Sequence, residues 1–166
     1  MNEIFKRASV RKFKPDKVTP VQIDQLVRAA MAAPTAGNQQ GWEFFVVTDP
    51  ELIHKLEAAS PYYGALKTAP LAIVVLADLN RMRLPDYWQQ DSAAATENIL
   101  LEAVSLDLGA VWMAVSPNET RIKAVSELLG LPHNVKPFNV IAIGTPETPV
   151  TQLDRFDSRK IHTNTY

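Results

Sequence analysis

Two short segments carry the side chains best suited to chemistry. Arg7-Ala8-Ser9-Val10-Arg11 places a hydroxyl group between two cations, and residues 34–42, Pro-Thr-Ala-Gly-Asn-Gln-Gln-Gly-Trp, form a turn rich in amide and hydroxyl groups. Guanidinium groups bind phosphate through charge-assisted hydrogen bonds, and amide groups can hydrogen-bond the edge of a planar heterocycle. Together the two segments predict a site for a phosphorylated cofactor that is bound without the usual glycine-rich loop.

Several other chemistries leave no pattern in the sequence. The six glycines are nowhere spaced as GxG or GxxxxGK, and there is no GxSxG segment, so a dinucleotide fingerprint, a P-loop and a nucleophile elbow are excluded. The three histidines lie far apart and none belongs to an HExxH motif, so we expect no metal site. Without cysteine the chain has no disulfide and no thiolate-bound metal or iron–sulfur cluster. Redox chemistry would therefore come from a bound cofactor.

Composition is typical of an ordinary globular enzyme. A chain of 166 residues with 46% apolar content can build one substantial core, so we predict a single domain over residues 1–166, in which residues 146–166 form an extended tail. The net charge of −1 gives no electrostatic reason to expect nucleic acid or an anionic membrane as a partner. Every apolar run is shorter than the roughly 20 residues of a membrane span. The N-terminal residues lack the apolar segment of a secretory signal, so we expect a cytoplasmic protein.

Apolar periodicity and turn residues predict alternating helices and strands. Thr19-Pro20 offers a helix start and Pro34 a stop. The predicted helices cover about residues 20–33, 50–59, 86–108 and 118–130, and the predicted strands cover 42–48, 71–77, 110–115 and 139–144. The strand at 71–77 is continuously apolar, which favours a position at the centre of a sheet.

Two local interpretations depend on this assignment. If residues 7–11 form a helical turn, Arg7 and Arg11 share one side with Ser9 near them, although an N-terminal helix with solvated arginines is the simpler alternative. The helix at 86–108 is apolar over most of its surface, which in a chain this small favours burial against a second subunit. We assign Gly109 to the left-handed cap that ends this helix.

The order and spacing of these motifs resemble the nitroreductase family of flavin enzymes over nearly the whole chain. The resemblance is carried first by the RxSxR segment, the TPxxIxxLVxAAxxAP helix and Asn38 before Gln40-x-Trp42. It continues in QDSAAA at 90–95, LGAVW at 108–112, IGTP at 143–146 and the late Arg155. Two positions depart from the family pattern. Gly41 stands where a proline is usual, and Ala8 stands where a second basic or histidine residue is common.

The resemblance implies a nitroreductase-like α+β fold, in which a central, mostly antiparallel sheet is flanked by helices in a three-layer α/β/α sandwich. It also implies an obligate homodimer with FMN at the subunit interface. The implied activity is that of an oxidoreductase with NADH or NADPH as a transient co-substrate, which reduces a small nitroaromatic, quinone or enone acceptor by a ping-pong hydride mechanism. A non-catalytic FMN-binding protein on the same fold, acting as a flavin carrier or redox sensor, is the alternative, because fold and activity are separable.

Site residues follow from the resemblance position by position. Arg7 resembles the phosphate-binding cation, with the backbone of Ala8 and the side chain of Ser9 as neighbouring contacts, and Arg11 resembles the cation that reaches the ribityl chain or the pyrimidine edge. The turn that approaches the flavin from the other subunit corresponds to Pro34, Thr35, Ala36 and Asn38. The strand end whose backbone faces the isoalloxazine near N5 corresponds to Trp112, Met113 and Ala114. The remaining cations are Arg155 and Lys160 for the phosphate and Lys67 for the pyrimidine side.

No side chain is predicted to act as a general acid, because a bound flavin carries the chemistry itself. We expect substrate choice to lie in the segments that cover the flavin, from Tyr62-Tyr63 to residues 84–88. Their aromatic side chains could line the pocket or pack into the core, and we expect about half of them to do the latter.

Overall fold

A four-stranded sheet forms the middle of the molecule. The structure is a computed structural model that describes residues 3–151 and 154–166. The strands are β1 (Trp42–Val47), β2 (Leu71–Asp78), β3 (Gly109–Ala114) and β4 (Val135–Gly144), and they lie in the order β1-β2-β4-β3. Every neighbouring pair is antiparallel, and β2 and β4 hold the central positions. The predicted central place of the apolar strand is thus confirmed.

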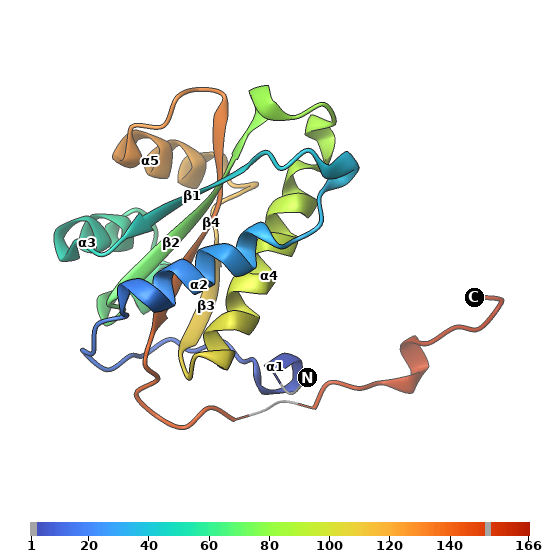
Figure 1. Ribbon diagram of the computed structural model, residues 1–166, viewed down its shortest axis with the longest axis horizontal. Coiled ribbons are helices and arrows are strands. Elements are labelled where there is room, and N and C mark those ends of the chain that lie inside the picture. The colour runs from blue at the N-terminus through green and yellow to red at the C-terminus, as the bar shows by residue number, and fades with distance from the viewer. Residues whose placement is uncertain (1–2, 152–153) are drawn as a thin grey trace.

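Helices cover both faces of this sheet. On one face lie α2 (Pro20–Met31) and α4 (Trp88–Ser105), and on the other lie α3 (Pro50–Ala58) and α5 (Glu119–Leu129), as Figure 1 shows. The short helix α1 (Glu3–Lys6) packs beside α4. The layers are therefore helix, sheet and helix, which confirms the predicted α+β sandwich.

Strand β2 explains why the sheet needs two helical layers. Its side chains alternate between two cores: Ile73 packs with Leu26 and Ile99 beneath α2 and α4, and Val74 packs with Leu56 and Val125 beneath α3 and α5. Successive strand residues point to opposite faces, so a strand that is apolar at every position is buried on both sides.

Some of the helix boundaries match the sequence prediction. Thr19 and Gln22 form a capping box at the start of α2, with Pro20 in its first turn, and Asp49 caps α3. Gly130 ends α5 in the left-handed conformation, with a φ of 63°.

The end of α4 differs from our prediction. The helix stops at Ser105, and the left-handed residue after it is Asp107, with a φ of 57°, whereas Gly109 is the first residue of β3. The assignment of Gly109 as a helix cap is wrong. A Cβ atom at this glycine would lie 2.6 Å from Val10 Cγ2, so glycine is needed here for a close approach of two chain segments.

Two further element boundaries shift. Helix α4 begins at Trp88 rather than near residue 86, because Pro85–Tyr87 form a separate 3₁₀ turn. Strand β4 begins at Val135, four residues before the predicted start, and contains Pro137. The register between β2 and β4 shifts opposite this proline, which is where a strand tolerates a residue without an N–H group.

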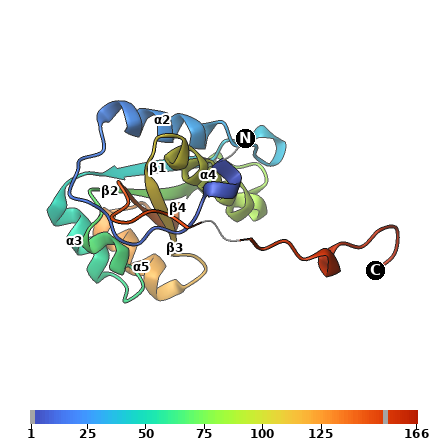
Figure 2. The same cartoon turned by 90° about the horizontal axis from the view of Figure 1, so that it is seen from below.

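The chain after β4 first lies along residues 12–14 and then leaves the body of the molecule. Lys12 accepts a hydrogen bond from Glu147, and Phe13 pairs with Pro146, so the beginning of the predicted tail is fixed to the body. The described residues from 154 onward project away from the other elements, as Figures 1 and 2 show, and carry one 3₁₀ turn, Ser158–Lys160. Residues 152 and 153 of the predicted tail lie outside the described residues. In the described ranges, no helix has the length and apolar content that crossing a bilayer would take.

Candidate functional site

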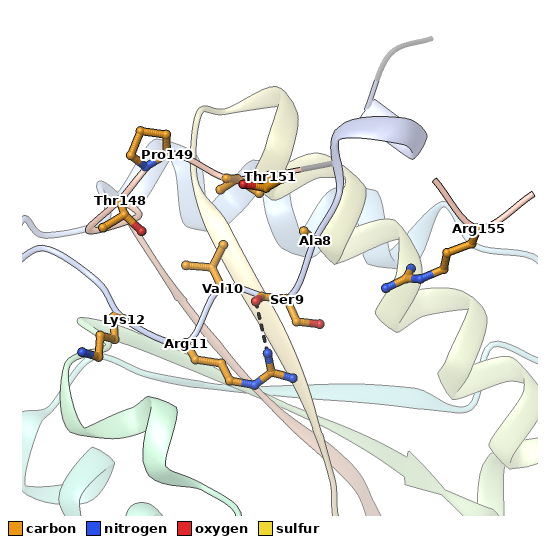
Figure 3. Close-up of a pocket in the computed structure, with 10 residues that line it drawn as sticks. Ala8, Ser9, Val10, Arg11, Lys12, Thr148, Pro149, Thr151 and Arg155 are labelled. Atoms are coloured by element: carbon orange, nitrogen blue, oxygen red, sulfur yellow. Dashed lines mark hydrogen bonds between the residues drawn. The ribbon is translucent and has the colours of Figure 1, made fainter. Parts of the chain in front are cut away.

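The first predicted motif lies along the edge of the sheet. Helix α1 ends at Lys6, and Ser9 then forms a parallel bridge with Ala110 of β3, where Val10 N–H donates to the Ala110 carbonyl at 3.0 Å. The premise of a helical turn at residues 7–11 is therefore wrong. Alternate residues of an extended segment share one side, so Ser9 and Arg11 still point together, opposite to Val10 (Figure 3).

We call residues 8–12 the N-terminal strip. A pocket of about 420 Å³ opens beside it. Its other wall comes from residues 148–151 and from Arg155 in the tail. The Arg155 side chain extends toward the side on which Ser9 lies, and the Arg11 guanidinium donates to the Ser9 carbonyl at 3.4 Å (Figure 3). Two guanidinium groups and several hydroxyls thus border one hollow, as an anionic ligand would require.

Three predicted cations lie elsewhere. Arg7 is not among the residues that line the pocket, and its Nε atom lies 3.4 Å from Glu97 Oε1 on α4. Lys67 pairs with Glu57 of α3 at 3.8 Å and borders a separate cavity of about 250 Å³. Lys160 is exposed in the tail, beyond the lining residues. Of the predicted cations, all of which belong to the described residues, only Arg11 and Arg155 line the same pocket within one chain.

The second predicted motif is the turn between α2 and β1. It is hydrogen-bonded to the N-terminal end of α4, whereas the N-terminal strip lies near the C-terminal end of this helix. Ala36 N–H donates to Asp91 Oδ1 at 2.9 Å, in the first turn of that helix. Ala8 and Val10 instead border a hollow with Val104 and Leu108, at the far end of α4. Residues 91 and 104 are thirteen residue steps apart, which at a rise of 1.5 Å per residue is about 20 Å along the helix axis. One chain therefore cannot bring its own turn to its own N-terminal strip.

The predicted strand end 112–114 lies on an open edge of the sheet. Strand β3 is an outer strand, and its Ala110 carbonyl points toward Val10, away from β4. Backbone groups alternate along a strand, so the N–H groups of Trp112 and Ala114 also point away from β4. The side chains differ: the Trp112 ring packs edge-on against Phe138 at 5.3 Å, Met113 is buried, and Ala114 is exposed. What these residues offer a ligand is mainly backbone.

Two side chains, Tyr63 from the expected cover segment and Arg121, which no motif indicated, bond the last carbonyl of this edge. Tyr63 Oη donates to the Ala114 carbonyl at 3.2 Å, and Arg121 Nη1 donates to the same oxygen at 3.0 Å. Burial raises the pKa of Tyr63 to about 12, although the nearby Arg121 guanidinium acts in the opposite direction. Arg121 also lies over the Tyr62 ring, 4.7 Å from its centroid. Nothing in the local sequence distinguishes Arg121 from an ordinary helix-surface arginine.

The aromatic residues proposed to cover the pocket divide as expected. Tyr63 is fully buried, and Trp88 packs edge-on against Phe138 at 5.9 Å. Tyr62 and Tyr87 are exposed and remain available to a ligand. The expectation that about half of these side chains pack into the structure is confirmed. Among the described residues, no group of three or more histidine and acidic side chains could hold a metal ion.

The fold and the ordered motifs together define a protein class. The profile of the nitroreductase family matches residues 4–61 and 57–145, and the chain belongs to this family.

Similar proteins carry names consistent with this family. A protein of Archaeoglobus fulgidus with the provisional name NADH dehydrogenase/NAD(P)H nitroreductase is 42% identical over 163 residues, which cover 96% of this chain and 94% of the relative. A crystal structure of a protein from Clostridium acetobutylicum, described provisionally as an NADH oxidase, has 52% identity and a TM-score of 0.97, with 99% of each chain covered. An FMN-dependent nitroreductase from Clostridium difficile has 31% identity and a TM-score of 0.92, with both chains fully covered.

Proposed function

We propose that this protein is an FMN-dependent oxidoreductase that takes reducing equivalents from NADH or NADPH and passes them to a small acceptor of the nitroaromatic, quinone or enone class. Family membership and the names of its relatives support the flavin and the nicotinamide. The geometric observation that carries the proposal is the separation of two half-sites, the N-terminal strip and the turn at 34–40, at opposite ends of α4.

A second subunit would unite these half-sites. In an antiparallel pair of α4 helices, the turn of one protomer lies at the end of α4 where its partner carries the N-terminal strip. The outward side of α4 suits such contact, because Ala94, Leu101 and Val104 are only half-buried in the single chain. The exposed Ile4 and Phe5 of α1 add apolar surface beside them. We therefore propose an obligate homodimer with two equivalent sites, each built from both protomers.

The residues present fit FMN. We propose that Arg7 and Arg155 hold the phosphate, with Lys160 as a third cation, while Ser9 and the Ala8 backbone supply further contacts. Arg155 and Ser9 border one hollow with Arg11, which supports this assignment, and Arg7 directly precedes Ala8, which lines the same hollow. The cavity of about 420 Å³ is within the range of cofactor sites. The chain has no GxGxxG segment, so the nicotinamide nucleotide would bind only transiently.

The chain itself contributes electrostatics and orientation. Bound FMN supplies the acceptance of hydride from NAD(P)H and its transfer to the acceptor. Arg11, beside the pyrimidine edge, would stabilise negative charge there, and backbone N–H groups at the open edge of β3 would face the reacting side of the ring. Thr35, Asn38, Pro34 and Ala36 of the partner would complete the walls, and Lys67 would require a rearrangement from Glu57 to take part. Donor and acceptor would use the same pocket in turn, which gives ping-pong kinetics.

Purification tests the proposal directly. We expect a yellow protein whose flavin absorbance is bleached by NADH or NADPH and restored by a quinone or nitroaromatic compound. A yellow protein that NAD(P)H does not bleach would identify a flavin carrier or sensor instead. A colourless protein that does not bind added FMN would contradict both. Light scattering should give the mass of two chains at micromolar concentration.

A further inference from the structure

Asp91 is a buried carboxylate whose partners all belong to the turn at 34–40. Its side chain is 4% exposed, Oδ1 accepts from Ala36 N–H at 2.9 Å, and Oδ2 accepts from Gln39 Nε2 at 2.6 Å. Among the ion pairs of the described ranges, none involves Asp91. A buried carboxylate without a cation is costly unless hydrogen bonds compensate it. Both oxygens of Asp91 therefore depend on the turn that they hold.

Gln39 also connects the turn to a third segment, at Leu84. Its Oε1 accepts from Leu84 N–H at 2.9 Å, and its Nε2 also lies 3.2 Å from the Leu84 carbonyl. A carboxylate only accepts hydrogen bonds, so Asp91 forces the NH₂ group of Gln39 toward itself and the Gln39 oxygen toward Leu84 N–H. Next to this link, Arg83 Nη2 donates to the Gly37 carbonyl at 2.9 Å. The orientation of the Gln39 amide, and with it the bond to Leu84 N–H, thus follows from the carboxylate of Asp91.

The turn that these bonds hold is strained. Gly37, Asn38 and Gln40 have φ values of 55°, 53° and 48°. Glycine adopts the left-handed region freely and asparagine tolerates it, so the strain lies mainly at Gln40, and it persists only where the surroundings fix it. Backbone strain held by a hydrogen-bond network with a buried anchor such as Asp91 is typical of segments that must present a defined surface.

We propose that Asp91 and Gln39 are positioning residues that lock the flavin-facing turn to residues 82–88, so that this second segment becomes a cover that selects the acceptor. Leu84 and Tyr87, which are 44% and 48% exposed, give the cover an apolar and aromatic surface suited to planar acceptors. This inference rests on the proposed function for the role of the cover, but the hydrogen-bond link itself does not depend on the flavin.

Amide hydrogen exchange in the flavin-free protein tests the link. In Asp91→Asn, no arrangement of the two amides can satisfy Ala36 N–H, the Gln39 side chain and Leu84 N–H together. If the asparagine oxygen stays on Ala36 N–H, its NH₂ group faces Gln39, which must turn its oxygen away from Leu84 N–H. We therefore expect roughly three- to tenfold faster exchange at Leu84, as the loss of one hydrogen bond would give. Asp91→Asn combined with Gln39→Glu reverses the direction of the bonds at constant net charge, and should restore protection at Leu84. Asp24→Asn, on the surface of α2, is the control.

Gln39→Ala keeps the test decisive if Asp91→Asn does not fold. It should speed exchange at Leu84 while Ala36, still bound to Asp91, stays protected. Unchanged exchange at Leu84 in both variants would overturn the link, as would a double variant that exchanges as fast as Asp91→Asn.

Kinetics test the cover. We expect Leu84→Ala to raise the KM for a planar acceptor roughly fivefold in the wild-type background and far less in Asp91→Asn, because broken positioning makes the two changes non-additive. Equal effects of Leu84→Ala in both backgrounds would overturn the selecting role. If wild-type protein binds no FMN, the proposed function is wrong and the selecting role falls with it, whereas the exchange results still decide the link.

Discussion

Arg7 and Arg11 are four residues apart but have different surroundings. The Nε of Arg7 is paired with Glu97 of α4, while Arg11 borders the pocket and donates to a carbonyl of its own strip. A cation near a phosphate stabilises the oxidised and reduced cofactor equally. One near the pyrimidine edge favours the reduced form, where negative charge develops. The two arginines should therefore affect different measurements.

We expect Arg11→Ala to lower the potential of bound FMN by tens of millivolts, since about 30 mV corresponds to 1.4 kcal/mol for a two-electron couple. Arg7→Ala should instead weaken FMN binding by about 1.5–3 kcal/mol and leave the potential nearly unchanged. Redox titration and FMN titration of both variants measure this. A larger drop in potential for Arg7→Ala would mean that the two roles are exchanged.

Tyr63 gives a prediction on stability. Its pKa rises from 10.0 to about 12 in the folded protein because it is buried. The folded state holds the phenolic proton more tightly, so this contribution is complete below pH 10 and is lost as the pH rises from about 10 to about 12. We expect the free energy of unfolding to fall by roughly 2–3 kcal/mol over this window, at about 1.4 kcal/mol per pKa unit.

Tyr63→Phe should abolish most of this alkaline loss. The variant lacks the hydrogen bond to the Ala114 carbonyl, so we expect it to be about 1 kcal/mol less stable at neutral pH. Urea unfolding between pH 7 and pH 12 measures both effects. An equally steep decline in the two proteins would assign the alkaline transition to other groups.

Residues of the candidate site differ in how far sequence reveals them. Ser9 and Arg11 were found because their types and spacing suit a phosphate, and extended backbone brings them together as well as a helix would. Asp91 had a weak signal, an acidic residue in a broadly apolar helix. Tyr63 was noted only as an aromatic residue that could cover the flavin, and Arg121 had no signal. Their shared contact depends on the packing of the loop after α3 and of α5 against the end of β3, which no local pattern encodes.

At the scale of elements, the strip against β3 is the critical contact. Gly109 permits it, since a Cβ there would lie 2.6 Å from Val10 Cγ2. We expect Gly109→Ala to push the strip from the sheet, with a loss of stability of about 1–3 kcal/mol and weaker FMN binding. Gly64→Ala is the matched control, because a Cβ at Gly64 meets no atom within 4 Å.

Thermal unfolding and FMN titration of the two glycine variants measure this difference. If Gly109→Ala bound FMN as tightly as Gly64→Ala, the position of the strip would not matter to the site.

The elements themselves were largely predictable where periodicity and caps agree, as in α2, α3 and β2. The errors arose where long-range contact overrides local preference. Gly109 has the residue type of a helix cap but serves the approach of Val10, and Pro137 has the type of a strand breaker but lies opposite a register shift in a central strand. Val10, which approaches Gly109, and Leu76, which pairs with Pro137, are both far away in the sequence.

At the scale of the whole molecule, half-sites at opposite ends of α4 make complementation possible. We expect Arg11→Glu, which inverts the charge of the strip, and Thr35→Trp, which obstructs the turn, each to abolish most FMN binding. A heterodimer of the two variants would contain one intact site and one doubly altered site. After random exchange of subunits, about a quarter of all sites should regain FMN and activity.

Mixing, partial unfolding and refolding of the two variants, followed by FMN titration, measures the recovery. Wild-type protein taken through the same procedure is the control. A mixture that stays at the level of its parents would show that each site is built from one chain.

The open edge of β3 also bears on solubility. An unpaired strand edge is a template on which another chain can add a strand, and proteins that leave one exposed tend to aggregate. Here the N-terminal strip occupies the edge at Ala110, and Arg121 and Tyr63 occupy the Ala114 carbonyl. The stretch between them is too short to seed a growing sheet, yet it offers the N–H groups of Trp112 and Ala114 to a small planar molecule. The strip at one end of this edge and the two side chains at the other leave room for a small ligand but prevent the addition of another strand.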